Sequence, residues 1–194
     1  MGKSNEMQIG KAGEYIVCAD VIMKGLIAYP SEQGLPYDVV IDNGTRLLKC
    51  QVKTTSAPRR IPQRSKESFA YIFNVKRHGK GNVKRYTPDD VDLFALVELE
   101  NRTVAYVKNE EMPDTINLRV DSLRGSYYDE KGVVDYDKVM ELNETISNQS
   151  EIARQLGLHV AQVNRMLADG YTPHKSTARY FSDFYATKEF FYEL

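Results

Sequence analysis

The chain has 194 residues, 42% of them hydrophobic, and its 26 basic and 27 acidic residues leave a formal net charge of −1. That is enough apolar sequence for one folded core and a small appendage. Because no run of about 18 apolar residues occurs and the chain starts with the polar MGKSNE, we expect a cytoplasmic protein with neither a membrane span nor a secretory signal.

The first predicted element is a helix over residues 8–24 that carries an acidic residue at the edge of its inward face. That face collects small and apolar side chains: Gly10, Gly13, Val17, Val21 and Met23, with Ile9, Ala12 and Ile16 beside them. Glu14 borders this face. A glycine costs a helix about 1 kcal/mol relative to alanine, so the two glycines indicate that another segment approaches closely. Alternatively, this is an ordinary N-terminal helix whose Glu14 extends to water.

Residues 37–54 (YDVVIDNGTRLLKCQVKT) predict a β-hairpin. Asn-Gly best tolerates the two positive φ angles of a type I′ loop, so we place Asn43 and Gly44 in the loop. This register puts Asp38 opposite Lys49 and diagonal to Gln51, at a distance of roughly 7–8 Å.

Side chains alternate along the two strands and divide the hairpin into two faces. The polar face holds Asp38, Lys49, Gln51 and Lys53. The apolar face, typical of strands that pack on helices, holds Val39, Ile41, Leu48, Cys50 and Val52. A polar hairpin face is commonly solvated. Here Val40 and Leu47 share the face of Asp38 and indicate partial cover, under which a carboxylate needs a partner or a metal ion.

Glu14, Asp38 and the triplet Gln51-Val52-Lys53 follow one another as a helical Glu, a strand Asp and a strand (D/E/Q)-x-Lys. In this pattern the chain resembles the PD-(D/E)XK nucleases, in particular the branch that contains group I intron-associated homing endonucleases and, more distantly, archaeal Holliday-junction resolvases. The resemblance covers residues 7 to about 120 and implies an α/β fold with an αβββαβ core and a mixed sheet. The chain departs from the family pattern at two places. The proline precedes Tyr37, at Pro36, and Gln51 replaces the usual acid, as it does elsewhere in this branch.

The resemblance implies metal-dependent hydrolysis of a phosphodiester bond by Glu14, Asp38, Gln51 and Lys53. A divalent cation neutralises the phosphate and generates hydroxide from water. Asp38 is the expected direct ligand, Glu14 acts directly or through water, and the Gln51 amide and the Val52 carbonyl complete the oxygen set. These oxygens suit Mg²⁺, with Mn²⁺ as a substitute. Lys53 is expected to orient water or to stabilise the oxyanion. Because Gln51 is neutral, we expect one essential cation.

The cysteines and histidines predict no further metal site. Cys18 and Cys50 both take core-facing positions, which indicates reduced thiols. The three histidines, His78, His159 and His174, have no ligand spacing, so we do not expect zinc.

Residues 46–85 contain twelve basic side chains and one acid, Glu67, whereas most acids lie between residues 89 and 151. This polarity predicts salt-dependent contacts with the phosphates of DNA. The expected contact residues in this half are Lys49, Arg59, Arg60, Arg64, Lys66, Lys76 and Arg77. Residues 56–66 (SAPRRIPQRSK) predict an exposed loop that could enter a groove. The alternative is a charge run on a solvated face.

Strands are predicted over residues 69–75, 93–99, 103–107 and 115–120. From residue 121 the chain becomes polar. We therefore predict a nuclease core over residues 1–125, a connecting segment over residues 126–144 and a helical domain over residues 145–194.

Residues 147–167 (SNQSEIARQLGLHVAQVNRML) predict two short helices with a turn at Gly157. The spacing of Ala153, Gly157 and Val163 resembles the helix-turn-helix of bacterial and phage repressors, which implies that the second helix enters the major groove. The implied DNA contacts are His159, Ala161, Gln162, Asn164 and Arg165. Alternatively, the two helices only pack on the core. The Phe- and Tyr-rich tail from His174 to Leu194 predicts core or dimer contacts.

Together these features predict a sequence-specific, Mg²⁺-dependent, double-strand DNA endonuclease of homing type in a bacterial, phage or archaeal cell. One site cuts one strand, so a homodimer or higher homo-oligomer is expected. A structure-selective junction resolvase is the alternative enzyme. A DNA-binding regulator without catalysis is the alternative from another class. Gln51 leaves the regulator open as an alternative, whereas Lys53 and the two carboxylates argue against it.

Overall fold

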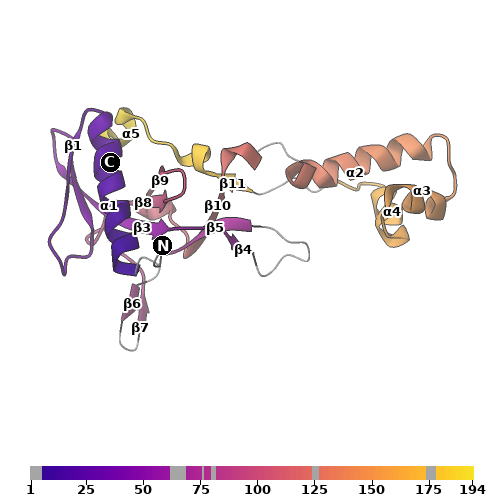
Figure 1. Ribbon diagram of the computed structural model, residues 1–194. Coiled ribbons are helices and arrows are strands. Elements are labelled where there is room, and N and C mark those ends of the chain that lie inside the picture. The colour runs from indigo at the N-terminus through magenta and orange to yellow at the C-terminus, as the bar shows by residue number, and fades with distance from the viewer. Residues whose placement is uncertain (1–5, 62–68, 76, 80–81, 124–126, 174–177) are drawn as a thin grey trace. The chain divides into compact units, whose positions relative to one another are not determined.

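A computed structural model of the protein describes residues 6–61, 69–75, 77–79, 82–123, 127–173 and 178–194 (Figure 1). The chain forms two compact units. The core unit comprises Met1–Asp121 with Arg179–Leu194, and the helical unit comprises Ser122–Ala178. Within the described residues, none of the helices is long and apolar enough to cross a membrane.

A five-stranded mixed sheet forms the centre of the core unit, in the order β1-β2-β3-β8-β9. Its strands are β1 (Ile27–Pro30), β2 (Val39–Asp42), β3 (Leu47–Thr55), β8 (Leu93–Glu98) and β9 (Thr103–Lys108). Only β3 and β8 pair in parallel, and the other neighbours are antiparallel. The mixed α/β fold predicted from the sequence is confirmed.

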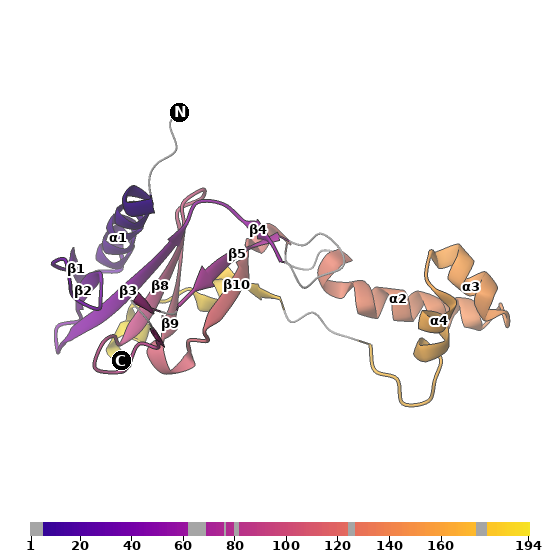
Figure 2. The same ribbon diagram turned by 90° about the horizontal axis from the view of Figure 1, so that it is seen from below.

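Helix α1 (Glu6–Met23) covers one face of this sheet (Figures 1 and 2). The core between helix and sheet contains Val17 and Val21 of α1 with the predicted apolar face of the hairpin. Every residue of β8 is buried, because its two faces pack into different clusters: Ala95 and Val97 face α1, whereas Phe94 and Leu96 face a second layer. Burial on both sides explains why Leu93 to Val97 are all apolar, while the buried carboxylate of Glu98 at the end of β8 accepts the N–H groups of Asn101 and Thr103.

The second layer is a four-stranded sheet in the order β11-β10-β5-β4. Its strands are β4 (Arg59–Arg60), β5 (Phe69–Asn74), β10 (Thr115–Arg119) and β11 (Arg179–Tyr180). In a separate two-stranded sheet, β6 (Arg77–Gly79) pairs antiparallel with β7 (Asn82–Lys84). The short helices of this unit are η1 (Asn109–Glu111), η3 (Phe181–Phe184) and α5 (Lys188–Tyr192), and η2 (Asp121–Leu123) spans the boundary between the two units.

The observed register of the β2–β3 hairpin corrects the predicted one by two residues. Val40 pairs with Lys49, and the Asp38 N–H donates to the Cys50 carbonyl at 2.9 Å, so Asp38 lies opposite Gln51. The loop residues are Gly44, with φ +85°, and Thr45, because the Asn43 side chain accepts the backbone N–H groups of Thr45 and Arg46. An even shift leaves every side chain on its predicted face.

Two details of the predicted covering also differ. Leu47 is 57% exposed and covers little of the polar face. In α1, Met23 is 81% exposed, because the helix ends there and the chain reverses at Gly25. The predicted close approach occurs at Gly13, where a Cβ would lie 1.9 Å from Thr54 Oγ1, whereas a Cβ on Gly10 would meet nothing within 4 Å.

The helical unit consists of α2 (Tyr127–Asn143), α3 (Gln149–Leu156) and α4 (Val160–Met166). The predicted connecting segment is therefore largely helical. Asn148 caps α3 by accepting the Ser150 and Glu151 N–H groups, and Gly157 ends α3 with φ +64°. Buried side chains from all three helices form a separate core: Val139, Ile152, Ala153, Val163 and Met166.

The sequence predicted that the helical domain extends to residue 194. Instead, the end of the chain, Arg179–Leu194, belongs to the core unit. Phe181 packs between the two sheets, and Phe191 packs under α1 beside Tyr106. The Phe191 carbonyl also accepts a hydrogen bond from the buried Asn43 side chain at 2.7 Å. The tail thus makes the core contacts that its aromatic composition predicted.

Candidate active site

Asp38 lies immediately before β2. Its backbone N–H pairs with the Cys50 carbonyl of β3, which places its side chain beside β3. Its carboxylate accepts the backbone N–H of Val52 at 2.9 Å and also the side-chain amide of Gln51. The same Gln51 nitrogen donates to the Val52 carbonyl at 3.3 Å. The predicted residues Asp38, Gln51 and Val52 therefore form one hydrogen-bonded cluster.

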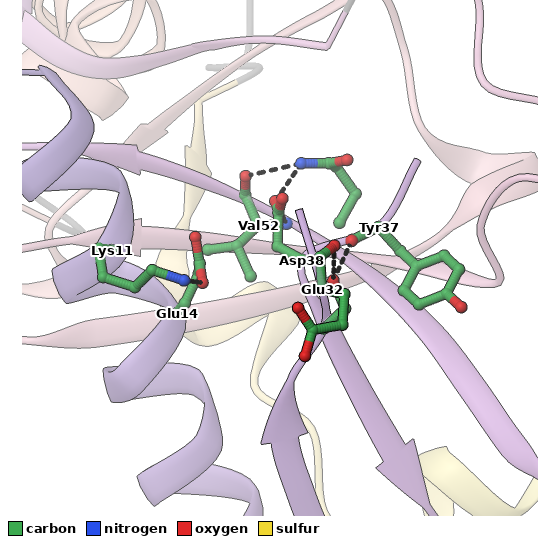
Figure 3. Close-up of polar contacts among 8 residues, drawn as sticks. Lys11, Glu14, Glu32, Tyr37, Asp38 and Val52 are labelled. Atoms are coloured by element: carbon green, nitrogen blue, oxygen red, sulfur yellow. Dashed lines mark hydrogen bonds and ion pairs between the residues drawn. The ribbon is translucent and has the colours of Figure 1, made fainter. Parts of the chain in front are cut away.

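Glu14 enters this cluster from α1. Its side chain is 15% exposed, and its carboxylate lies on the side of Asp38 and Val52 in Figure 3. Lys11 Nζ donates to Glu14 Oε2 at 2.5 Å. Lys11 was not predicted from the sequence, although its position three residues before Glu14 on one helix face is a signal that could have found it.

Lys53 is two residues beyond Gln51 on the same face of β3, and an aromatic ring supports its ammonium. The Nζ atom lies 3.4 Å from the Tyr86 hydroxyl and 5.4 Å from the centre of the Tyr86 ring. Tyr86 in turn packs edge-on against Phe94 of β8. No sequence signal pointed to Tyr86, because it lies 33 residues from Lys53 in the chain.

The pKa of Asp38 lies above its ordinary value, chiefly because burial disfavours the charged form. The Val52 N–H opposes this shift, the charge of Glu14 adds to it, and Lys53 and Gln51 oppose it. A nearby cation would stabilise the charged form of a carboxylate that is desolvated and lies beside a second carboxylate.

Residues 4–127 match the family model described as PD-(D/E)XK endonuclease, which is more than half of the chain. The chain belongs to this family. A solved structure of similar fold is that of the bacterial homing endonuclease I-Ssp6803I, with a TM-score of 0.51 and 18% identity over 63% of this chain and 84% of that chain. At this identity the likeness concerns the fold alone. A comparison with curated proteins finds no match.

PD-(D/E)XK nucleases generally use divalent metal ions, and the donor set of this endonuclease fits one. No group of three or more Cys, His, Asp and Glu side chains suitable for a metal occurs in the described part of the chain, so the two carboxylates need neutral oxygens beside them. The Val52 carbonyl supplies one. Gln51 directs its amide nitrogen, a partial positive charge, between this carbonyl and Asp38. Rotation of the amide would present its oxygen there. Such a set suits a hard cation rather than zinc.

Residues 46–85, which are almost free of acids in the sequence, contact acidic residues from later segments in the folded protein. Arg46 pairs with Asp92 at 2.9 Å, and Arg85 pairs with Asp114 at 2.8 Å. Lys49 donates to the Asp89 carbonyl at 2.5 Å. Acidic segments that follow residue 85 in the chain thus fold back onto the basic region.

Among the other predicted contacts of this region, Arg59 and Arg60 are exposed and form the short strand β4 rather than a loop. Arg64, Lys66 and Lys76 lie outside the described residues. Arg77 lies in β6, for which the structure describes the backbone.

In the helical unit of the endonuclease, the residues predicted to contact DNA lie on the outer side of α4. Asn164 and Arg165 are exposed, whereas Val163 points into the core. His159 and Gln162 line a hollow of about 340 Å³ together with Arg165 and Tyr171. His159 also caps α4, accepting the Ala161 N–H at Nδ1.

Proposed function

We propose that this endonuclease is a Mg²⁺-dependent, sequence-specific enzyme that cuts double-stranded DNA in the manner of homing endonucleases. The observation that carries the proposal is the cluster of Asp38, Gln51 and the Val52 carbonyl, with Glu14 beside it and Lys53 two residues further on. A carboxylate pair, neutral oxygens and one ammonium are the groups that metal-assisted phosphodiester hydrolysis requires.

When bound, a divalent cation supplies positive charge at the scissile phosphate and makes hydroxide accessible near neutral pH. Asp38 and Glu14 would hold this cation, and the carbonyl of Val52 and, after rotation, the amide oxygen of Gln51 would complete the oxygen set. Lys53 hydrogen-bonds to the attacking water or to the phosphate oxygens, where negative charge develops. Tyr86 restricts the ammonium of Lys53 to this place by its hydroxyl and its ring. Because Gln51 is neutral, one cation per site suffices.

The helical unit gives the enzyme its choice of site. The described α3–Gly157–α4 geometry, with Ala153 and Val163 buried, supports a helix-turn-helix in which α4 enters the major groove. Gln162, Asn164 and Arg165 have the side-chain types that form paired hydrogen bonds with base edges. Exposed Arg59 and Arg60 of the core unit contact phosphates. Cutting both strands requires two sites, so we propose a homodimer or a higher homo-oligomer.

Incubation with genomic DNA and Mg²⁺, followed by mapping of the new ends, tests this function. We expect cutting at a small set of related sequences, which EDTA abolishes and Mn²⁺ restores. Asp38→Asn should abolish cutting. The matched control is Asp42→Asn, four residues further along the chain on the same face, where the carboxylate accepts the Gly44 N–H of the hairpin loop. Equal loss in both variants, or ends without a common sequence, would contradict the proposal.

A further inference from the structure

The Lys11–Glu14 ion pair joins an exposed cation to an enclosed ligand of the proposed metal site. The side chain of Lys11 is 46% exposed, whereas that of Glu14 is 15% exposed. Among the described residues, Lys11 is the hydrogen-bond partner of Glu14, at 2.5 Å. Figure 3 shows the Lys11 side chain reaching along α1 to the carboxylate.

A second ion pair, at the end of the same helix, has a structural role. Lys24 binds Asp20 at 2.6 Å, and Asp20 also accepts the Tyr106 hydroxyl at 2.6 Å, which fastens the end of α1 to β9. Asp20 thus has a structural partner besides its lysine. The charge of Glu14 acts instead on Asp38 of the proposed site.

The carboxylates of the site stabilise the charged form of Lys11. The pKa of Lys11 lies above its ordinary value, chiefly through its hydrogen bond to Glu14, and the negative charge of Asp38 contributes in the same direction. An exposed ion pair contributes little to stability. The position of Lys11 is therefore better explained by the carboxylates of the site than by stability of the helix.

We propose that Lys11 is a displaceable counter-ion of the active site, a role that rests on the proposed function. Its ammonium neutralises Glu14 until a divalent cation takes that carboxylate, and it then binds a phosphate of the DNA strand in the site. The two positive charges repel each other across one carboxylate, so a bound cation weakens the hold of Glu14 on Lys11. The flexible, exposed stem of lysine allows the ammonium to move to a nearby phosphate.

Calorimetric titration of the DNA-free protein with Ca²⁺ and with Mn²⁺ tests the competition. Lys11→Met should bind either cation about twofold to fivefold more tightly than wild type, the size expected from removing a partly exposed ion pair. Lys11→Arg should resemble wild type, as should the matched control Lys24→Met. Unchanged or weaker cation binding by Lys11→Met would overturn the inference.

Transfer of the ammonium to DNA predicts an effect that depends on the cation. With Ca²⁺ present and the DNA verified to be intact, Lys11→Met should lower the salt slope of DNA binding by about 0.9, the loss of one phosphate contact. Lys11→Arg should keep the slope. In EDTA, wild type and Lys11→Met should have equal slopes, since Lys11 is then held by Glu14. The same slope difference with and without Ca²⁺, or none in either, would contradict the transfer.

Asp38→Asn separates this inference from the proposed function. If neither cation binds in an Asp38-dependent way, the proposed function fails, and the inference fails with it. If Asp38-dependent binding exists and Lys11→Met leaves it unchanged, only the inference fails.

Discussion

The two regions that we assign to DNA differ in how far the protein itself fixes their side chains. In the hairpin, Asp38 is partly buried and bonded to Val52 and Gln51. On α4, Asn164 and Arg165 are exposed side chains. Hydrolysis needs groups placed before the substrate arrives, whereas reading of bases needs side chains that adapt to the DNA. Substitutions in the hairpin should therefore impair cutting, whereas substitutions on α4 should impair the choice of DNA sequence.

Asp38→Asn and Lys53→Met should remove cutting and leave DNA binding nearly unchanged. Both residues act at the reacting phosphate, and losing such a group costs about 10²-fold to 10³-fold or more in rate. Single-turnover cleavage beside a binding assay in Ca²⁺ measures the two effects separately. Lys24→Met is the control, since this lysine pairs with Asp20 and is not among the expected DNA contacts. Binding that falls in parallel with cutting would contradict the assignment.

Substitutions on α4 should have the opposite effect: the rate of cutting at a permissive sequence stays unchanged, and the choice of sequence becomes less strict. The variants are Gln162→Ala, Asn164→Ala and Arg165→Ala. Each should cost about 1–3 kcal/mol of discrimination at particular base pairs. Sequencing of the ends cut from a randomised DNA library measures this. Glu141→Gln, an exposed change on α2 of the same unit, serves as a control. Unchanged preferences in all three variants would show that α4 only packs.

The two glycines of α1 should respond in opposite directions to alanine. Gly13→Ala should destabilise the protein by about 1–3 kcal/mol, because its Cβ overlaps Thr54 Oγ1 in the core. Gly10→Ala meets open space and should stabilise the helix by about 1 kcal/mol. Urea unfolding measures both, and Thr54→Ala should largely rescue Gly13→Ala. Two similar values would contradict the described approach of α1 to β3.

Substitutions of Gln51 should have a smaller effect, on cation affinity. Gln51→Glu adds a negative charge and should lower the Mg²⁺ concentration needed for half-maximal cutting, whereas Gln51→Ala should raise it, each by up to about tenfold. Cutting rates across a Mg²⁺ titration measure the shift. Wild-type behaviour of both variants would place Gln51 outside the metal site.

The hairpin and the composition of its two faces could be predicted from the sequence, because both follow from the alternation of side chains along a strand, which is a local property. It was insufficient for the register, because Asn43 uses its side-chain oxygen to accept backbone N–H groups and so moves the loop to Gly44 and Thr45. The error did no harm to the site. An even shift kept the faces and placed Asp38 directly opposite Gln51.

What the sequence could not supply are contacts between distant segments. Tyr86 reaches Lys53 from another part of the chain, and Asp92 and Asp114 reach basic residues that have few acidic neighbours in sequence. The return of Phe191 to the core depends on the space left between α1 and β9. Local periodicity contains no information on such space.

Excision of the helical unit tests most directly whether chemistry and site choice lie in separate parts of the protein. Its two ends join β10 and β11, which are parallel neighbours, so a flexible linker of about ten residues can replace Ser122–Ala178 and keep Arg179–Leu194 in the core. The folded variant should cut DNA with Mg²⁺ in an Asp38-dependent way, at many unrelated sequences. A folded variant that cuts the same sites as the full chain, or none, would contradict this division.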